Sequence, residues 1–166
     1  MNYYRLRVSE NDSIQLAGAD PLFALMKSGR QFKWPAHVQV VEDAKGVAYD
    51  WVPGWSWCPF VTSNVRNNLE VLLGEGVQWH GPFVFHKNTY HLLNCTTIVD
   101  CALRASNCNQ MRLDHSKLGG VHMFRPNRFR KHLFVSEALR DAIVTNGDTG
   151  VRFGLLKPDG WEEFPF

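Results

Sequence analysis

The sequence predicts an α+β (mixed α/β) fold, in which a mixed-direction sheet packs with helices. Two observations lead to this prediction. Short β-branched and aromatic runs alternate with helical patterns along the chain, which favours sheet and helices packed in layers. In addition, residues 46–79 and 120–153 resemble one another at a constant offset of 74 residues. We therefore expect a single domain over residues 1–166, built from two degenerate strand–loop–helix–strand repeats.

Composition places the chain among ordinary globular proteins and narrows its partners. It is 45% hydrophobic and 20% charged, with a formal net charge of +2. A balance so close to neutral does not favour nucleic acid as a partner. No apolar run approaches the roughly 20 residues of a membrane helix, and the amino terminus lacks the apolar core of a secretory signal. We expect a cytoplasmic protein with no membrane partner, and the oligomeric state stays open.

Local signals in the first half predict a strand, a helix and then further strands. The run Tyr3–Val8 is rich in aromatic and β-branched residues, which favours a strand. A helix follows, with Asp20 as N-cap, Pro21 at its first position and Gly29 at its end. Short strands are expected at residues 37–43, 46–51 and 77–85, and a loop at residues 51–59.

The second half contains the strongest strand signal of the chain. Residues 90–105 include four consecutive β-branched residues, Thr96–Val99, which pack well on a pleated surface. Both faces of this segment are largely apolar, as in a central strand covered on both sides. Further strands are expected at residues 120–124 and 150–156. The tail, residues 157–166, contains too many Pro and Gly residues for regular structure.

The repeated stretch reads PFVTSNVRNNL at residues 59–69 and LFVSEALRDAI at residues 133–143. Each copy predicts a strand end, a capping hydroxyl and an amphipathic helix. The caps would be Thr62 or Ser63 in the first copy and Ser136 in the second. Gly74 and Gly147 would end the helices. This common pattern predicts a degenerate internal duplication.

No motif in the sequence points to a cofactor, a metal site or a known catalytic arrangement. The seven His residues are scattered, and no C-x-x-C pair supports zinc. Cys58 and Cys108 lie in loops and could be exposed, but nothing pairs either with a particular His. We expect buried, reduced thiols. A small cytosolic enzyme with an unrecognised His or Cys site stays open as an alternative.

Two loops at equivalent places in the repeats are candidate partner-binding sites. The first loop carries Trp and the second Arg, the two residue types most enriched at interface hot spots. The candidate residues are Trp51, Trp55, Trp57, Arg125, Arg128, Arg130 and Lys131. We hypothesise that the loops form one composite binding edge. As an alternative, the Arg125–Lys131 loop could bind a nucleic-acid backbone.

Two motifs in the carboxy-terminal part of the chain are shared with a known family. One motif is a Tyr-x-Leu-Leu-Asn strand followed by an Asp, and the other is a Phe-Val-Ser helix start followed by a Gly-x-x-Phe strand. The matching residues are Tyr90, Leu92, Leu93, Asn94, Asp100, Phe134, Val135, Ser136, Gly150 and Phe153. Through these motifs the carboxy-terminal part resembles an immunity-protein domain of bacterial polymorphic toxin systems. This resemblance covers roughly residues 50–156. It implies a cytosolic, non-catalytic protein that binds and neutralises one cognate toxin. The toxin-contacting residues of the family cannot be assigned to positions in this chain, because these surfaces differ with each toxin.

Overall fold

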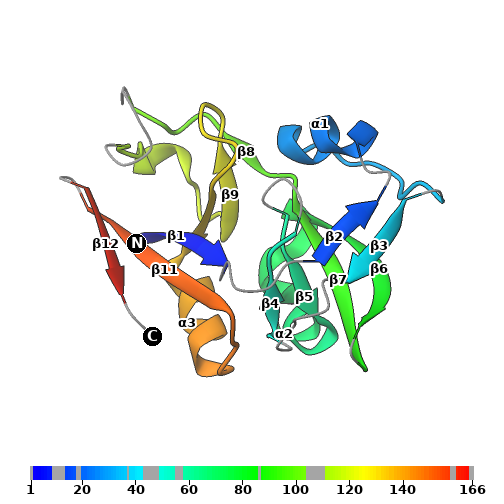
Figure 1. Cartoon of the computed structure of the whole chain (residues 1–166). Coiled ribbons are helices and arrows are strands. Elements are labelled where there is room, and N and C mark those ends of the chain that lie inside the picture. The colour runs from blue at the N-terminus through cyan, green and yellow to red at the C-terminus, as the bar shows by residue number, and fades with distance from the viewer. Residues whose placement is uncertain are drawn as a thin grey trace.

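A computed structural model describes residues 2–8, 14–17, 20–36, 38–42, 49–54, 58–85, 87–103, 111–157 and 160–164. It has an α+β fold with three α-helices and sheets on two sides of the molecule (Figure 1). This confirms the predicted fold class. No helix among the described residues is long and apolar enough to cross a membrane.

The larger sheet has six strands in the order β12-β11-β1-β10-β9-β8. All of its pairs are antiparallel except β8 with β9, which is parallel. The strands are β1 (Tyr3–Val8), β8 (Ile98–Val99), β9 (Met123–Pro126), β10 (Leu133–Ser136), β11 (Val151–Lys157) and β12 (Gly160–Phe164). The N-terminal strand β1 is therefore an interior strand of this sheet.

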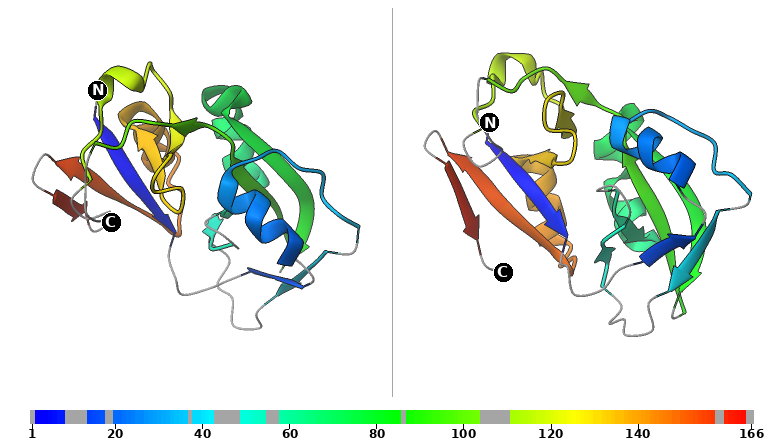
Figure 2. Two further views of the ribbon diagram at one scale, coloured as in Figure 1. Left: turned by 90° about the horizontal axis from the view of Figure 1, so that it is seen from above. Right: turned by 45° about the horizontal axis from the view of Figure 1, so that its top comes forward.

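The second sheet has four antiparallel strands in the order β4-β5-β7-β6. They are β4 (Trp51–Val52), β5 (Phe60–Thr62), β6 (Val77–Phe85) and β7 (Asn88–Cys95). Strands β2 (Ile14–Ala17) and β3 (Gln39–Glu42) form a separate antiparallel pair. From β7 the chain crosses to the edge of the six-stranded sheet through β8, as Figure 2 shows.

The helices begin and end where the capping residues predict. In α2 (Ser63–Leu73), Thr62 is the N-cap and accepts a hydrogen bond from the backbone of Val65. In α3 (Glu137–Thr145), Ser136 has the same role. Gly74 and Gly147 follow the two helices with positive φ. The third helix, α1 (Asp20–Ser28), starts at Asp20 itself and is followed by Gly29.

The two larger sheets share one local architecture. In the four-stranded sheet β7 lies between β5 and β6, and in the six-stranded sheet β1 lies between β10 and β11. The register agrees on both sides of these interior strands. Equivalent pairs are His91–Val61 and Tyr4–Val135 on one side, and Leu93–Trp79 and Leu6–Phe153 on the other. The strand order is thus repeated, although β1 and β7 stand at different places in the sequence; a duplication as its origin stays a prediction.

One hydrophobic core unites the two halves. Helices α2 and α3 lie side by side (Figure 1), and their apolar faces belong to a single buried cluster. Leu69 of α2 and Ile143 of α3 are both fully buried in it. Helix α1 packs on the opposite face of the four-stranded sheet through Leu22 and Met26. A third cluster covers the opposite face of the six-stranded sheet.

Three predicted elements differ from the structure. The long strand expected at residues 90–105 breaks after Cys95, because the backbone N–H groups of Thr96 and Thr97 both bond to the carbonyl of Gly76. The tail expected to be irregular forms β12, whose backbone pairs with β11. Of the strand expected at residues 46–51, residues 46–48 lie outside the described part of the chain, and only Trp51 belongs to β4.

Candidate partner-binding site

The two candidate loops meet through a buried contact. Arg125, at the start of the second loop, donates from Nη2 to Sγ of Cys58 in the first loop at 3.2 Å. Both side chains are 0% exposed. The prediction that Arg125 presents its charge to a partner is therefore wrong, because its guanidinium is used inside the fold. Cys58, which its place in a loop could have exposed, is buried, in agreement with the expectation of buried thiols.

Trp51 is also buried, so its predicted contact with a partner is wrong. Its backbone pairs with Val61 in the sheet, and its side chain is 0% exposed in the central core. The indole Nε1 donates to Oδ2 of Asp148 at 3.2 Å. Trp51 thus joins the two halves from inside. Trp55 and Trp57 lie outside the described residues.

The remaining candidates line an open pocket between α1 and the β9–β10 connection, which we call the α1 pocket. Its volume is about 590 Å³, within the range of ordinary ligand pockets. The described residues that line it are Ala24, Lys27, Ser28, Asn127, Arg128, Phe129, Arg130, Lys131 and His132. Four of them are Lys or Arg, and none carries a carboxylate. Lys27 of α1 was missed by sequence reasoning, because it lies about a hundred residues from the other three.

Buried and half-buried arginines hold the two walls of the α1 pocket together. Nη1 of Arg125 donates to the carbonyls of Met26 in α1 and Arg130 in the connection, at 3.3 and 3.0 Å. Nη1 of Arg130 donates to the carbonyl of Ser28 at 3.5 Å. The last carbonyls of a helix have no partner within the helix, so these contacts cap α1. Arg125 therefore positions the candidate site rather than touching a partner.

A second cluster brings a hydroxyl and an imidazole together, as a hydrolase would require. Oγ of Ser63 lies 3.0 Å from Nε2 of His91, and Nη1 of Arg66 lies 3.4 Å from Nδ1 of the same ring. Burial and the nearby Arg66 charge lower the pKa of His91, which favours the neutral ring. Because Arg can only donate, Nδ1 accepts and the ring proton is on Nε2. His91 then donates to Ser63 and is not arranged to take its proton.

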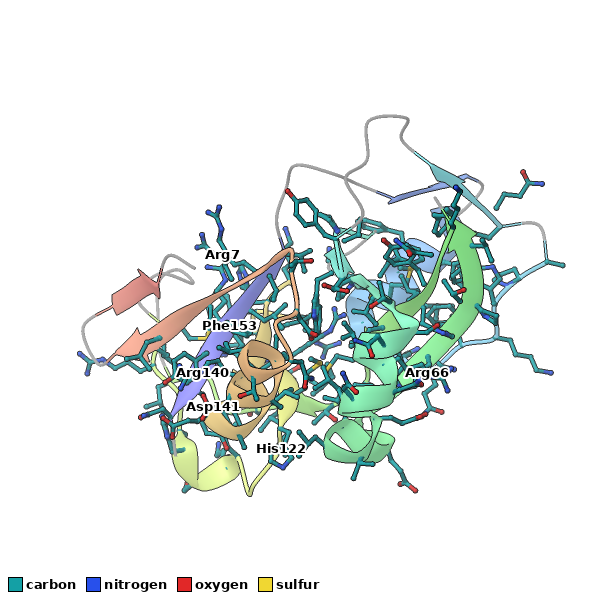
Figure 3. The ribbon with its side chains drawn as sticks, turned by 90° about the horizontal axis from the view of Figure 1, so that it is seen from below. Arg7, Arg66, His122, Arg140, Asp141 and Phe153 are labelled. Atoms are coloured by element: carbon teal, nitrogen blue, oxygen red, sulfur yellow. The ribbon has the colours of Figure 1, made fainter. Side chains whose placement is uncertain are left out.

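This His91 cluster has a counterpart in the other half. The equivalent positions hold Tyr4, Glu137 and Arg140, with Cζ of Arg140 lying 4.6 Å from the centroid of the Tyr4 ring. Figure 3 shows Arg140 on α3 and Arg66 on α2. In both halves an arginine from the helix contacts a ring on the interior strand. The shared geometry indicates a packing role for this cluster.

The described cysteines are buried thiols. Burial raises the pKa of Cys58, and it raises those of Cys95 and Cys101 to about 11. These three residues are free, which confirms the prediction of reduced thiols for them; Cys108 lies outside the described part of the chain. Within the described ranges, no group of three or more His, Cys, Asp or Glu side chains could hold a metal ion.

A comparison with protein-family models finds no match to this chain, and neither does a comparison with curated proteins. The resemblance to an immunity-protein domain therefore stays a prediction.

Proposed function

We propose that this chain is an immunity protein that binds one cognate bacterial toxin and neutralises it by direct, non-catalytic contact in the cytoplasm. The observation that carries the proposal is the α1 pocket, an open basic surface on a rigid support. Its exposed side chains, Lys27, Arg128 and Lys131, project from a helix end and a loop. Loops on a rigid scaffold are the usual carriers of binding residues.

The support beneath the pocket fits a protein that binds without reacting. Arg125 ties α1, the β9–β10 connection and Cys58 together inside the molecule. A surface fixed in this way loses little conformational freedom on association, which favours affinity. The resemblance of residues 50–156 to an immunity domain adds the class of partner, and the buried thiols suit a reducing compartment.

The test is capture of the partner followed by a functional assay. The chain serves as bait in a lysate of its native cells, and stoichiometric partners are identified by mass. Each partner gene is then expressed alone and together with this chain. We expect a partner that arrests growth alone and no longer does so when the chain is present, with a dissociation constant of about nanomolar or below.

Two results would overturn the proposal. One is capture of a partner whose expression leaves growth unaffected with or without this chain. The other is rescue of growth by chemical turnover, in which a small amount of the chain inactivates a large excess of the partner. A stoichiometric inhibitor must instead reach the partner's own concentration, so titration of the two purified proteins separates binding from catalysis.

A further inference from the structure

We propose that the α1 pocket is an anion-binding site that takes the carboxylate side chains of an acidic segment of the partner. The identity of the partner rests on the proposed function, but the chemistry comes from the pocket. Four of the chain's 18 Lys and Arg residues line it, although the net charge of the whole chain is only +2. Positive charge is therefore concentrated here.

The four cations have different roles. Arg130 is committed to the protein: Nε donates to the carbonyl of Asn127 at 3.2 Å, Nη2 to its side chain at 2.5 Å, and Nη1 to Ser28. Lys27, Arg128 and Lys131 are exposed. The three exposed groups line the same pocket on two walls that Arg125 and Arg130 fix in place, so the backbone of these walls need not rearrange when an anion arrives.

The carboxyl end of α1 would repel an anion in the pocket if its last carbonyls had no hydrogen-bond donors. The carboxyl end of α1 carries partial negative charge on its last carbonyls. Arg125 and Arg130 already donate to two of these carbonyls, those of Met26 and Ser28. These two arginines compensate the negative end of the helix dipole within the protein. The exposed cations are then the dominant charge of the pocket.

Positive charge also continues beyond the pocket towards β1. His132 lines the pocket, and its pKa is lowered to about 4 by burial and by the neighbouring cations Arg5, Arg7 and Lys131. The ring is neutral at pH 7. Strand β1 carries Arg5 and Arg7 on either side of Leu6, which pairs with Leu133, the residue next to His132. An extended acidic segment suits this layout better than a single small anion.

An acidic peptide segment fits the pocket better than a nucleic acid does. Single-stranded nucleic acid is held by a basic groove together with exposed aromatic rings on which bases stack. Two of the described lining residues carry aromatic rings. Phe129 packs against the third core cluster, and His132 is partly buried, so neither ring is fully open for stacking. Lysine ammonium groups on flexible stems can pair with carboxylates spaced along a peptide.

The experiment measures binding of a short fluorescent Glu-rich peptide by anisotropy, with a Gln-rich peptide of equal length as the uncharged comparison. The pocket variant combines Lys27→Glu, Arg128→Glu and Lys131→Glu. Its matched control combines Lys33→Glu, Lys87→Glu and Lys117→Glu, three exposed lysines outside the pocket with the same change in net charge. All substituted side chains are exposed, and unfolding curves check that both variants keep the fold.

We expect the Glu-rich peptide to bind, the pocket variant to lose at least about tenfold in affinity, and the control to stay within about twofold. Equal losses in the two variants would overturn the proposal, because only net charge would then matter. Tighter, steeply salt-dependent binding of a single-stranded oligonucleotide through the same three residues would replace the acidic segment with nucleic acid.

The two proposals fail separately. If the toxin is captured and the pocket variant binds and neutralises it as well as the unmodified chain does, the pocket proposal is wrong and the proposed function stands. If the Glu-rich peptide binds at the pocket but no captured partner is a toxin, the proposed function is wrong and the anion site stands.

Discussion

His80 is held as a neutral aromatic ring in a buried stack. Its imidazole lies 4.3 Å from the ring of Phe32 at an interplanar angle of 19°, and 5.6 Å from the ring of Trp34. The residue is 7% exposed, and no group among the described residues bonds to its Nε2. Burial lowers its pKa from 6.5 to about 4. Protonation in the folded state is therefore unfavourable.

This burial predicts a loss of stability in mild acid. Between pH 6.5 and about 4 the unfolded chain binds a proton at His80 and the folded chain does not, so the free energy of unfolding falls as the pH decreases. A shift of this size corresponds to at most about 3 kcal/mol, and less where solvent reaches the ring. We expect His80→Phe to keep the stack and flatten the pH profile, measured by urea unfolding at several pH values. A variant profile as steep as that of the unmodified chain would contradict this; His132→Gln serves as comparison for the other strongly shifted histidine.

The burial of Arg125 could have been predicted from strand periodicity. Alternate residues of a strand face the same side. Met123 points into the central core, so Arg125, two residues later on β9, faces the same side. The cluster of basic residues around it suggested a solvent-exposed loop. What the sequence could not supply are the acceptors, Cys58 and the carbonyl of Met26, which come from distant segments.

At the scale of elements, local signals predicted most helices and strands but not their partners. Capping residues located α2 and α3, and runs of aromatic and apolar residues located β1, β6 and β7. The β-branched run Thr96–Val99 lies beyond β7, in the break and in β8. The break at Thr96 could not be predicted, because it depends on the carbonyl of Gly76 in another segment. Strand β12 was missed because its pairing with β11 overrides a composition rich in Gly and Pro.

Strand β1 occupies in one sheet the place that β7 occupies in the other. Leu6 pairs with Leu133 and Phe153, and the equivalent Leu93 pairs with Trp79 and bonds to the carbonyl of Pro59. Leu6 is 5% exposed and Leu93 is 0% exposed, and both belong to the central core. A strand so near the N-terminus would ordinarily be expected to fray. Here its interior position ties it to the global fold.

We therefore expect Leu6→Ala to destabilise the protein about as much as Leu93→Ala. Both substitutions leave a cavity in the same core, at a cost of about 2–5 kcal/mol in the free energy of unfolding. Val84→Ala, at a strand position that is 73% exposed, is the control and should cost less than about 0.5 kcal/mol. Urea unfolding measures all three. A cost for Leu6→Ala no greater than that of the control would mean that β1 detaches before the protein unfolds.

At the scale of the whole molecule, polar contacts reinforce the shared core. Oδ2 of Asp50 accepts hydrogen bonds from both the backbone N–H and the hydroxyl of Thr149, at 3.0 and 2.7 Å. The backbone N–H of Trp51 donates to the carbonyl of Thr149 at 3.0 Å. The segment before β11 is therefore attached to the segment that enters β4. This attachment joins the two sheets at their rims as well as through their helices.

The 74-residue offset between the two repeats placed the two candidate loops at equivalent positions, but it aligned the first residues of the loops incorrectly. At an offset of 74 Trp51 corresponds to Arg125, whereas in the sheets Trp51 pairs with Val61 as Met123 pairs with Val135. A difference of two residues in loop length produces this slip. Sequence reasoning therefore found the exposed residues of the α1 pocket, Arg128 and Lys131, but misplaced the buried ones. Only the folded chain brings Lys27 beside them.

Gly150 marks a close approach between the halves. Its φ is +81°, and an added Cβ would overlap the carbonyl oxygen of Trp51 and lie 2.7 Å from Cβ of Tyr49. Gly147, in the same connection, has a similar φ of +72° but nothing within 4 Å of an added Cβ. The pair separates two effects, because both positions impose the conformational strain and only one imposes a clash.

Gly147→Ala should cost about 1–2 kcal/mol in the free energy of unfolding, the penalty of a side chain in the left-handed region. Gly150→Ala should cost clearly more, by about 2 kcal/mol or beyond, because Trp51 and Tyr49 of the other half must move away from the new methyl group. Urea unfolding gives both values, and near-ultraviolet circular dichroism reports the packing of Trp51. Equal costs in the two variants would show that the halves separate readily at this rim. A larger cost at Gly150, with a changed tryptophan signal, would show that their apposition contributes directly to the stability of the fold.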